Sequence, residues 1–258
     1  MCVHGFTGDG RDFDVLKDVG IEDIDEWWAV DVPGHGQSER PDQVMLYQSE
    51  SVRHQFDQVL RYIREQTEAT ELVVLGYSMG GRLVLQWLVW ANRLVNVNRV
   101  VVVGASPGIE DEHARQERQA WDHNLANRIA SEGVERFLAY WQDIPLLRSQ
   151  SNIPEPFLSE LRARRLTNDG RGLALSLRGF GSGTMPSIWD EVSQFTEVPV
   201  LYVAGALDEK YVRVGQRLAR ACRVVTCVEI EGAGHTAHLE KPEAFTKAVR
   251  CWGESIQN

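Results

Sequence analysis

Serine, aspartate and histidine occur in an order and in local settings that suit a catalytic triad. Ser78 is the central residue of a G-x-S-x-G pattern at residues 76–80, whose small residues permit a sharp turn from strand to helix. Asp208 ends a Gly-Ala-Leu-Asp segment, and His235 follows a Gly-Ala-Gly segment. In a triad the histidine takes the serine proton while the carboxylate fixes the imidazole tautomer. We therefore predict a triad of Ser78, Asp208 and His235.

Each of these residues also has a simpler interpretation. Ser78 could cap a helix, Asp208 could cap a helix that begins near Lys210, and His235 could be an ordinary loop histidine. Their joint placement favours the triad. His238 lies close by, but the glycines before His235 supply the turn that lets an imidazole reach the serine, so we expect His238 to support His235.

A second loop could stabilise negative charge. In the His-Gly-Phe sequence at residues 4–6, the glycine permits a close approach and the Phe6 amide can point inward. The partner donor would be the Met79 amide, directly after the predicted nucleophile. We predict an oxyanion hole formed by Phe6 and Met79; the alternative is a simple turn after a short strand.

Apolar runs and helical patterns predict the scaffold that must position these residues. Short apolar runs bounded by Gly or Pro indicate buried strands, and apolar residues at helical spacing indicate helices. Strands are predicted at residues 27–31, 72–75, 100–104, 198–205 and 224–230, and helices at 51–66, 83–94 and 242–255. This alternation predicts an α/β fold with a doubly wound, mostly parallel sheet. The triad residues follow strand ends, where such a sheet assembles its site.

Residues 107–194 lack a clear strand and are rich in arginine, with helical segments at 120–129 and 134–141. We interpret them as a helical cap inserted between core segments 1–106 and 195–258. An arginine-lined pocket beneath the cap would favour a small polycarboxylate, because guanidinium groups bind carboxylates in a bidentate fork. Most single cap arginines are expected to be solvated. Arg82, one helical turn beyond Ser78, begins near the site.

Composition narrows the class of protein. The 258 residues carry 27 basic and 37 acidic side chains, a formal charge of -10, which disfavours nucleic acid and anionic lipid as partners. No stretch approaches the roughly 18 apolar residues of a membrane span, and the four cysteines lack zinc or redox spacing. We expect one cytoplasmic domain without stable membrane association, as a monomer or small homo-oligomer.

Several motifs together resemble a particular enzyme family. They are HGFTG at residues 4–8, DVPGHG at 31–36, GYSMGGR at 76–82, SPGI at 106–109 and SLRG at 176–179, with Trp189. The first two are shared with many α/β hydrolases, whereas the last three are more specific. The chain resembles the SHCHC synthases of menaquinone biosynthesis, the MenH family, whose members have strands before the His-Gly-Phe loop. Those strands are expected to be missing here.

This resemblance implies an α/β-hydrolase fold and a lyase, 2-succinyl-6-hydroxy-2,4-cyclohexadiene-1-carboxylate (SHCHC) synthase. The triad would act as a general base, and pyruvate would leave the enolpyruvyl group of a substrate with three carboxylates. No cofactor or metal is implied. By motif match, the residues that would bind the substrate are Tyr77, Arg82, Arg118, Trp141, Arg165 and Lys210.

Two other functions fit the same residues. In an ester hydrolase or carbon-carbon bond hydrolase, Ser78 would attack as a nucleophile and water would complete the reaction. In a ligand-binding protein of this fold the triad would be retained without activity. An arginine-lined pocket favours the polycarboxylate, and an apolar pocket favours the hydrolase.

Overall fold

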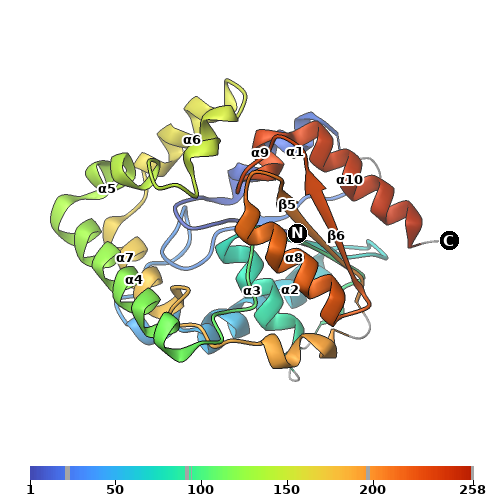
Figure 1. Cartoon of the computed structure of the whole chain (residues 1–258), viewed down its shortest axis with the longest axis horizontal. Helices are drawn as coiled ribbons and strands as arrows, with labels where there is room; N and C mark the ends of the chain where they lie inside the picture. Colours follow the sequence, from blue (N-terminus) through green and yellow to red (C-terminus); the bar gives the residue numbers. More distant parts are fainter. Residues whose placement is uncertain (21–23, 91–92, 94, 196–197, 257–258) are drawn as a thin grey trace.

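The computed structural model describes residues 1–20, 24–90, 93, 95–195 and 198–256. Their core is a parallel sheet of six strands in the order β2-β1-β3-β4-β5-β6 (Figure 1). The strands are β1 (Cys2–Val3), β2 (Ala29–Val30), β3 (Val73–Tyr77), β4 (Arg99–Val103), β5 (Val200–Gly205) and β6 (Val225–Ile230). The sheet and the helices around it confirm the predicted fold class.

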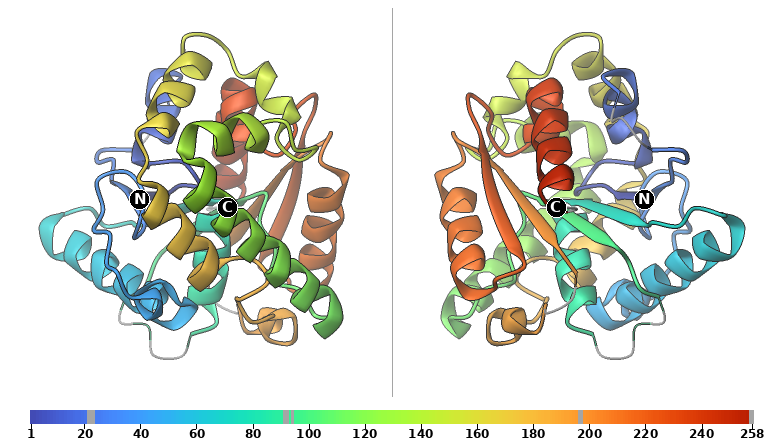
Figure 2. Two further views of the ribbon diagram at one scale, coloured as in Figure 1. Left: turned by 90° about the vertical axis from the view of Figure 1, so that its left-hand side faces the viewer. Right: turned by 90° about the vertical axis from the view of Figure 1, so that its right-hand side faces the viewer.

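Helices cover both faces of this sheet, as the two side views in Figure 2 show. Val100 and Val102 of β4 pack in one hydrophobic cluster with α2 (Ser49–Gln66), α3 (Met79–Leu88) and α8 (Glu209–Ala221). Val101 and Val103 point to the other face, against α1 (Asp14–Asp18), α9 (Ala237–Glu240) and α10 (Pro242–Ser255). A strand buried on both faces explains the continuous valine run of β4.

Several predicted elements have other bounds in the structure, and the segment expected at 120–129 is the middle of a longer helix, Glu112–Glu132. The strand expected at residues 27–31 contains only Ala29 and Val30, at the edge of the sheet, where it pairs with the two-residue strand β1. The helix expected at 83–94 begins earlier, at Met79, because the Ser78 turn leads directly into it. It ends at Leu88, whose carbonyl accepts a hydrogen bond from Arg93. Positions 91, 92 and 94 of that prediction lie outside the described residues.

A layer of helices lies over the carboxyl ends of the strands (Figure 1). It consists of α4 (Glu112–Glu132), α5 (Val134–Trp141), α6 (Phe157–Leu166), α7 (Gly170–Phe180) and the short 3-10 helix η3 (Arg148–Asn152). Leu125, Phe137 and Leu173 form its own hydrophobic cluster, against which Phe6 of the core packs. The 3-10 helix η4 (Trp189–Gln194) lies outside this layer and packs in the main core cluster through Trp189 and Val192. We call residues 107–194 the cap, and their boundaries stay a prediction. Across the described ranges, no helix is long and apolar enough to cross a membrane.

Candidate active site

Ser78 occupies a strained turn between β3 and α3. Its φ of 50° and ψ of -104° are unfavourable for any residue with a Cβ, and its amide donates to the Val103 carbonyl at 2.8 Å. The turn needs small neighbours: a Cβ on Gly80 would lie 2.3 Å from the Val3 carbonyl oxygen. Gly80 of the G-x-S-x-G pattern is therefore required by the close packing of β1 against the start of α3, and Gly76 by its own close contact with that helix start.

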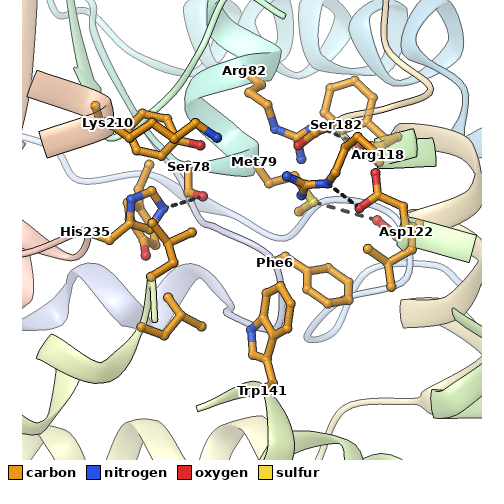
Figure 3. A pocket seen from close by; sticks show the side chains of 18 of the residues that line it. Phe6, Ser78, Met79, Arg82, Arg118, Asp122, Trp141, Ser182, Lys210 and His235 are labelled. Atoms are coloured by element: carbon orange, nitrogen blue, oxygen red, sulfur yellow. Dashed lines mark hydrogen bonds and ion pairs between the residues drawn. The ribbon is translucent and has the colours of Figure 1, made fainter. Parts of the chain in front are cut away.

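His235 lies between Ser78 and Asp208 in a continuous hydrogen-bonded chain, and Figure 3 shows its bond to Ser78. Its Nε2 is 3.0 Å from Ser78 Oγ, and its Nδ1 is 2.7 Å from Asp208 Oδ2. The Asp208 carboxylate accepts a hydrogen bond from the Nδ1–H group of His235. The unprotonated Nε2 of the same ring can therefore take the serine proton. His235 is 2% exposed and Asp208 is 9% exposed, so this chain is shielded from solvent.

Two loops hold the aspartate and the histidine together. The Leu207 amide donates to the Ala233 carbonyl at 2.9 Å. At Gly205 an added Cβ would lie 2.1 Å from the Gly234 carbonyl oxygen, so the loops approach as closely as backbone permits. The glycines noted in the sequence before Asp208 and His235 thus serve contact between the two loops.

His4 fixes the predicted oxyanion loop. Its Nε2 accepts a hydrogen bond from the Val32 amide at 3.1 Å, so its Nδ1 carries the proton and donates to the Gly5 carbonyl at 2.7 Å. The Gly80 amide donates to the His4 carbonyl at 3.0 Å, which joins this loop to the nucleophile turn. Phe6 and Met79 both line the cavity at Ser78. Among the described residues neither of their amides has a hydrogen-bond acceptor.

Four cationic side chains line the same cavity as Ser78 and His235: Arg82, Arg118, Arg165 and Lys210. In Figure 3 the Arg82 and Arg118 guanidinium groups lie near each other on one side of the cavity, and Lys210 lies on the other. Arg118 pairs with Asp122 at 2.8 Å. Asp122 is the one carboxylate among the described residues that line this cavity. The cavity wall therefore carries more positive than negative charge.

Two of these cations form no ion pair with a carboxylate among the described residues; Arg165 is buried, whereas Arg82 is partly exposed. Arg82 donates to the Phe180 carbonyl at 3.1 Å and to Met185 Sδ at 3.3 Å. Burial, together with repulsion from Arg118, lowers the pKa of Arg82 to about 10, so it stays protonated at neutral pH. Arg165 is 8% exposed and donates to Gln150 Oε1 at 2.8 Å, and burial lowers its pKa. A buried cation without a counter-ion is a ready site for an anion.

The remaining predicted substrate residues are aromatic. Tyr77 is buried, its hydroxyl is 3.1 Å from Thr236 Oγ1, and burial raises its pKa above the usual range. Trp141 packs edge-on against Phe6 with ring centroids 5.5 Å apart and stacks on Phe137. The Phe6 and Trp141 rings are visible below Ser78 and Met79 in Figure 3.

The structure thus places all six predicted substrate residues, and both predicted oxyanion residues, around one cavity. Their roles stay predictions. Asp208 lies behind His235, away from the lining. Other cap arginines have partners elsewhere: Arg164 pairs with Asp9 and Asp12, Arg171 with Asp42, Arg128 with Glu132, and Arg178 donates to Asn127.

Buried polar residues that the sequence analysis missed connect the cap to the triad. Gln150 joins Arg165 to Thr236, since its Nε2 donates to Thr236 Oγ1 at 2.9 Å. Glu240, on α9, accepts from backbone amides of the histidine loop. Neither residue belongs to a recognisable motif. Proximity to His235 in the sequence was the one signal available for Thr236 and Glu240.

His238 packs between aromatic rings. Its ring centroid is 4.6 Å from that of Tyr77 and 5.4 Å from that of Phe13. Neither ring nitrogen has a hydrogen-bond partner among the described residues, and burial lowers its pKa to about 3. His35 is also fully buried, and burial lowers its pKa well below the usual value.

Comparison with known proteins agrees with this geometry. The alpha/beta hydrolase family matches residues 1–248. A Bacillus subtilis protein, provisionally named a 2-succinyl-6-hydroxy-2,4-cyclohexadiene-1-carboxylate synthase, is 34% identical over 96% of this chain and 88% of its own length. The Salmonella paratyphi C synthase of that name is 27% identical, over 96% and 91% of the two chains. The structure of MenH from S. aureus superposes with a TM-score of 0.89 at 28% identity, covering 100% and 94%. The chain therefore belongs to the α/β-hydrolase family, in the branch of the 2-succinyl-6-hydroxy-2,4-cyclohexadiene-1-carboxylate synthases.

Proposed function

We propose that this chain is a carbon-oxygen lyase of menaquinone biosynthesis, which eliminates pyruvate from 2-succinyl-5-enolpyruvyl-6-hydroxy-3-cyclohexene-1-carboxylate to give SHCHC. The observation that carries the proposal is a hydrogen-bonded triad that shares one cavity with Arg82, Arg118, Arg165 and Lys210. Two of these arginines, Arg82 and Arg165, form no ion pair with a carboxylate in the described part of the chain. A tricarboxylate substrate supplies the missing negative charge.

The triad provides the base. Ser78 Oγ accepts a ring proton of the substrate as its own proton passes to His235 Nε2, and Asp208 stabilises the imidazolium that forms. The electron pair of the broken carbon-hydrogen bond moves through the ring and breaks the carbon-oxygen bond to the enolpyruvyl group. Pyruvate enolate leaves and takes up one proton. The number of protons is conserved, and no water is consumed.

Negative charge that develops during this step needs donors already in place. The Phe6 and Met79 amides are free among the described residues and come from two segments that the His4 contacts hold together. Such preorganised donors stabilise an anion because they need no reorientation during the reaction. Arg82, Arg118 and Arg165 bind carboxylates away from the ring proton, so they orient the substrate and take no part in proton transfer.

The test is pyruvate release from the enolpyruvyl substrate, generated in situ by the preceding enzyme, with SHCHC followed by absorbance. We expect release by the wild type and a loss of about a thousandfold or more in kcat for Ser78→Ala, because alanine has no oxygen to accept the ring proton. Ser151→Ala, which removes an exposed serine of η3, is the matched control and should retain activity.

The same triad could instead attack an ester or a carbon-carbon bond, with water completing the reaction. Aryl-ester hydrolysis with no pyruvate release would replace the lyase by that hydrolase. Failure in both assays by folded protein would support a ligand-binding role and contradict both enzymatic assignments.

A further inference from the structure

Glu240 is a buried carboxylate that the proposed chemistry does not use. It ends α9, is 1% exposed, and forms no ion pair among the described residues. Burying a carboxylate without a cation is costly, and a neutral glutamine of the same shape would avoid much of that cost. A charged side chain at this buried position therefore suggests that the Glu240 carboxylate has a specific role.

The carboxylate is held by three donors around the histidine. Glu240 Oε2 accepts from the Gly234 amide at 2.7 Å, and Oε1 accepts from the Thr236 amide at 3.0 Å. These amides belong to the residues directly before and after His235. Charge-assisted hydrogen bonds of this kind are among the stronger ones in proteins. Glu240 consequently holds the backbone in place at Gly234 and Thr236, on both sides of His235.

The third donor comes from the cap. Ser149 of η3 donates through Oγ to Glu240 Oε1 at 2.9 Å. Ser149 also lies directly against the histidine loop, since a Cβ on Gly234 would lie 2.1 Å from Ser149 Oγ. The next cap residue, Gln150, donates to Thr236 Oγ1. The cap is thus joined to the histidine loop at two adjacent points.

We propose that Glu240 is a positioning residue that sets the His235 imidazole between Ser78 and Asp208, and that Ser149 makes this setting depend on the cap. The inference rests on the proposed function only in that His235 serves as the base. Any displacement of the loop acts on two hydrogen bonds at once, to Ser78 Oγ and to Asp208 Oδ2. A misplacement of about 1 Å at such a group can cost about a hundredfold in rate.

The decisive variant is Glu240→Gln in the full chain. Its amide must turn an NH₂ group toward either the Gly234 or the Thr236 N–H, so one of the two bonds is lost whichever way it is oriented. We expect kcat for pyruvate release to fall about tenfold or more, with KM within about twofold of wild type. Glu243→Gln, which makes the same change at an exposed residue of α10, is the matched control.

A spectroscopic readout separates positioning from general damage. The proton of the His235–Asp208 hydrogen bond should give a far-downfield proton NMR signal in the ligand-free protein. We expect Glu240→Gln to shift or broaden it, and Glu243→Gln to leave it unchanged. Wild-type kcat in Glu240→Gln, or a lower kcat with an unchanged signal, would overturn the proposal. The NMR comparison needs no substrate, so it remains decisive even if pyruvate release fails in the wild type.

Ser149→Ala keeps the test valid if Glu240→Gln does not fold. It removes one donor and leaves the carboxylate in place, so we expect a smaller shift of the same signal and a drop in kcat of about threefold. Ser151→Ala, two residues along η3, is its control. An unchanged signal in a folded Ser149→Ala protein would remove the proposed dependence on the cap.

Discussion

Arg82 keeps its charge in a setting that gives it little solvation. Its guanidinium lies 5.4 Å from the centroid of the Phe180 ring and bonds a carbonyl and a thioether, with no carboxylate partner among the described residues. Its pKa of about 10 is below that of an arginine in the unfolded chain. Protonated Arg82 therefore opposes folding at every pH below about 10, and a bound anion relieves this cost.

Arg82→Met should separate stability from function. Methionine keeps much of the volume and removes the charge, so we expect the ligand-free protein to gain about 1 kcal/mol in unfolding free energy. We expect KM for the enolpyruvyl substrate to rise about tenfold or more, because a charged hydrogen bond to a carboxylate is lost. Thermal unfolding and pyruvate-release kinetics measure the two effects. Arg171→Met, which breaks an exposed pair with Asp42, should change neither. An Arg82→Met protein with lower stability and unchanged KM would contradict this account.

Between elements, the contact that matters most joins the loops after β5 and β6. Gly205 lies against the carbonyls of Ala233 and Gly234, and this contact brings Asp208 to His235. Carbonyl oxygens belong to the backbone and cannot rotate away as a side chain could. A methyl group at Gly205 must therefore move one loop relative to the other.

We expect Gly205→Ala to lower kcat about tenfold or more and to lower the unfolding free energy by about 1 to 3 kcal/mol. The matched control is Gly170→Ala at the start of α7, where the new Cβ would lie 3.2 Å from a Val134 methyl group that can adjust. Kinetics and urea unfolding of both variants are the measurements. If Gly205→Ala and Gly170→Ala have the same kcat and the same unfolding free energy, the contact between the two loops is unimportant.

Local patterns predicted most elements because their causes are local. The spacing of apolar residues predicted the bounds of α5 and α10. Glycine-containing turns after apolar runs pointed to Ser78, Asp208 and His235 as site residues. The length of β2 could not be predicted from its own residues, because it is set by pairing with β1. Only two residue pairs connect the two strands. Gln150 and Glu240 were missed for a similar reason. Their partners Thr236 and Ser149 lie 86 and 91 residues away, and no local pattern encodes a contact between two loops.

Over the whole molecule, buried neutral histidines link stability to pH. Burial lowers the pKa of His238 to about 3, and that of His35 also falls. In the unfolded chain each histidine takes up a proton near pH 6.5, whereas the folded chain does not. The stability that each neutral ring contributes is therefore complete above about pH 6.5, and it is lost as the pH falls toward 3.

His238→Phe should weaken this acid sensitivity. Between pH 7 and 4.5 we expect the variant to lose about 2 to 3 kcal/mol less unfolding free energy than the wild type. Urea unfolding at the two pH values measures this difference, and any constant cost of the larger ring cancels. His113→Gln, at an exposed histidine of α4, should follow the wild type. If both variants follow the wild type, another group dominates acid unfolding.

The separation of Ser78 from His235 also bears on how the site arises during folding. Their hydrogen bond spans 157 residues, and the whole cap lies between them in the chain. Helices form early because their contacts are local, whereas contacts between distant segments wait for loop closure. A collapsed intermediate can therefore hold most of the native helix while its serine has no base. Catalytic competence is one of the last properties that the folding chain acquires.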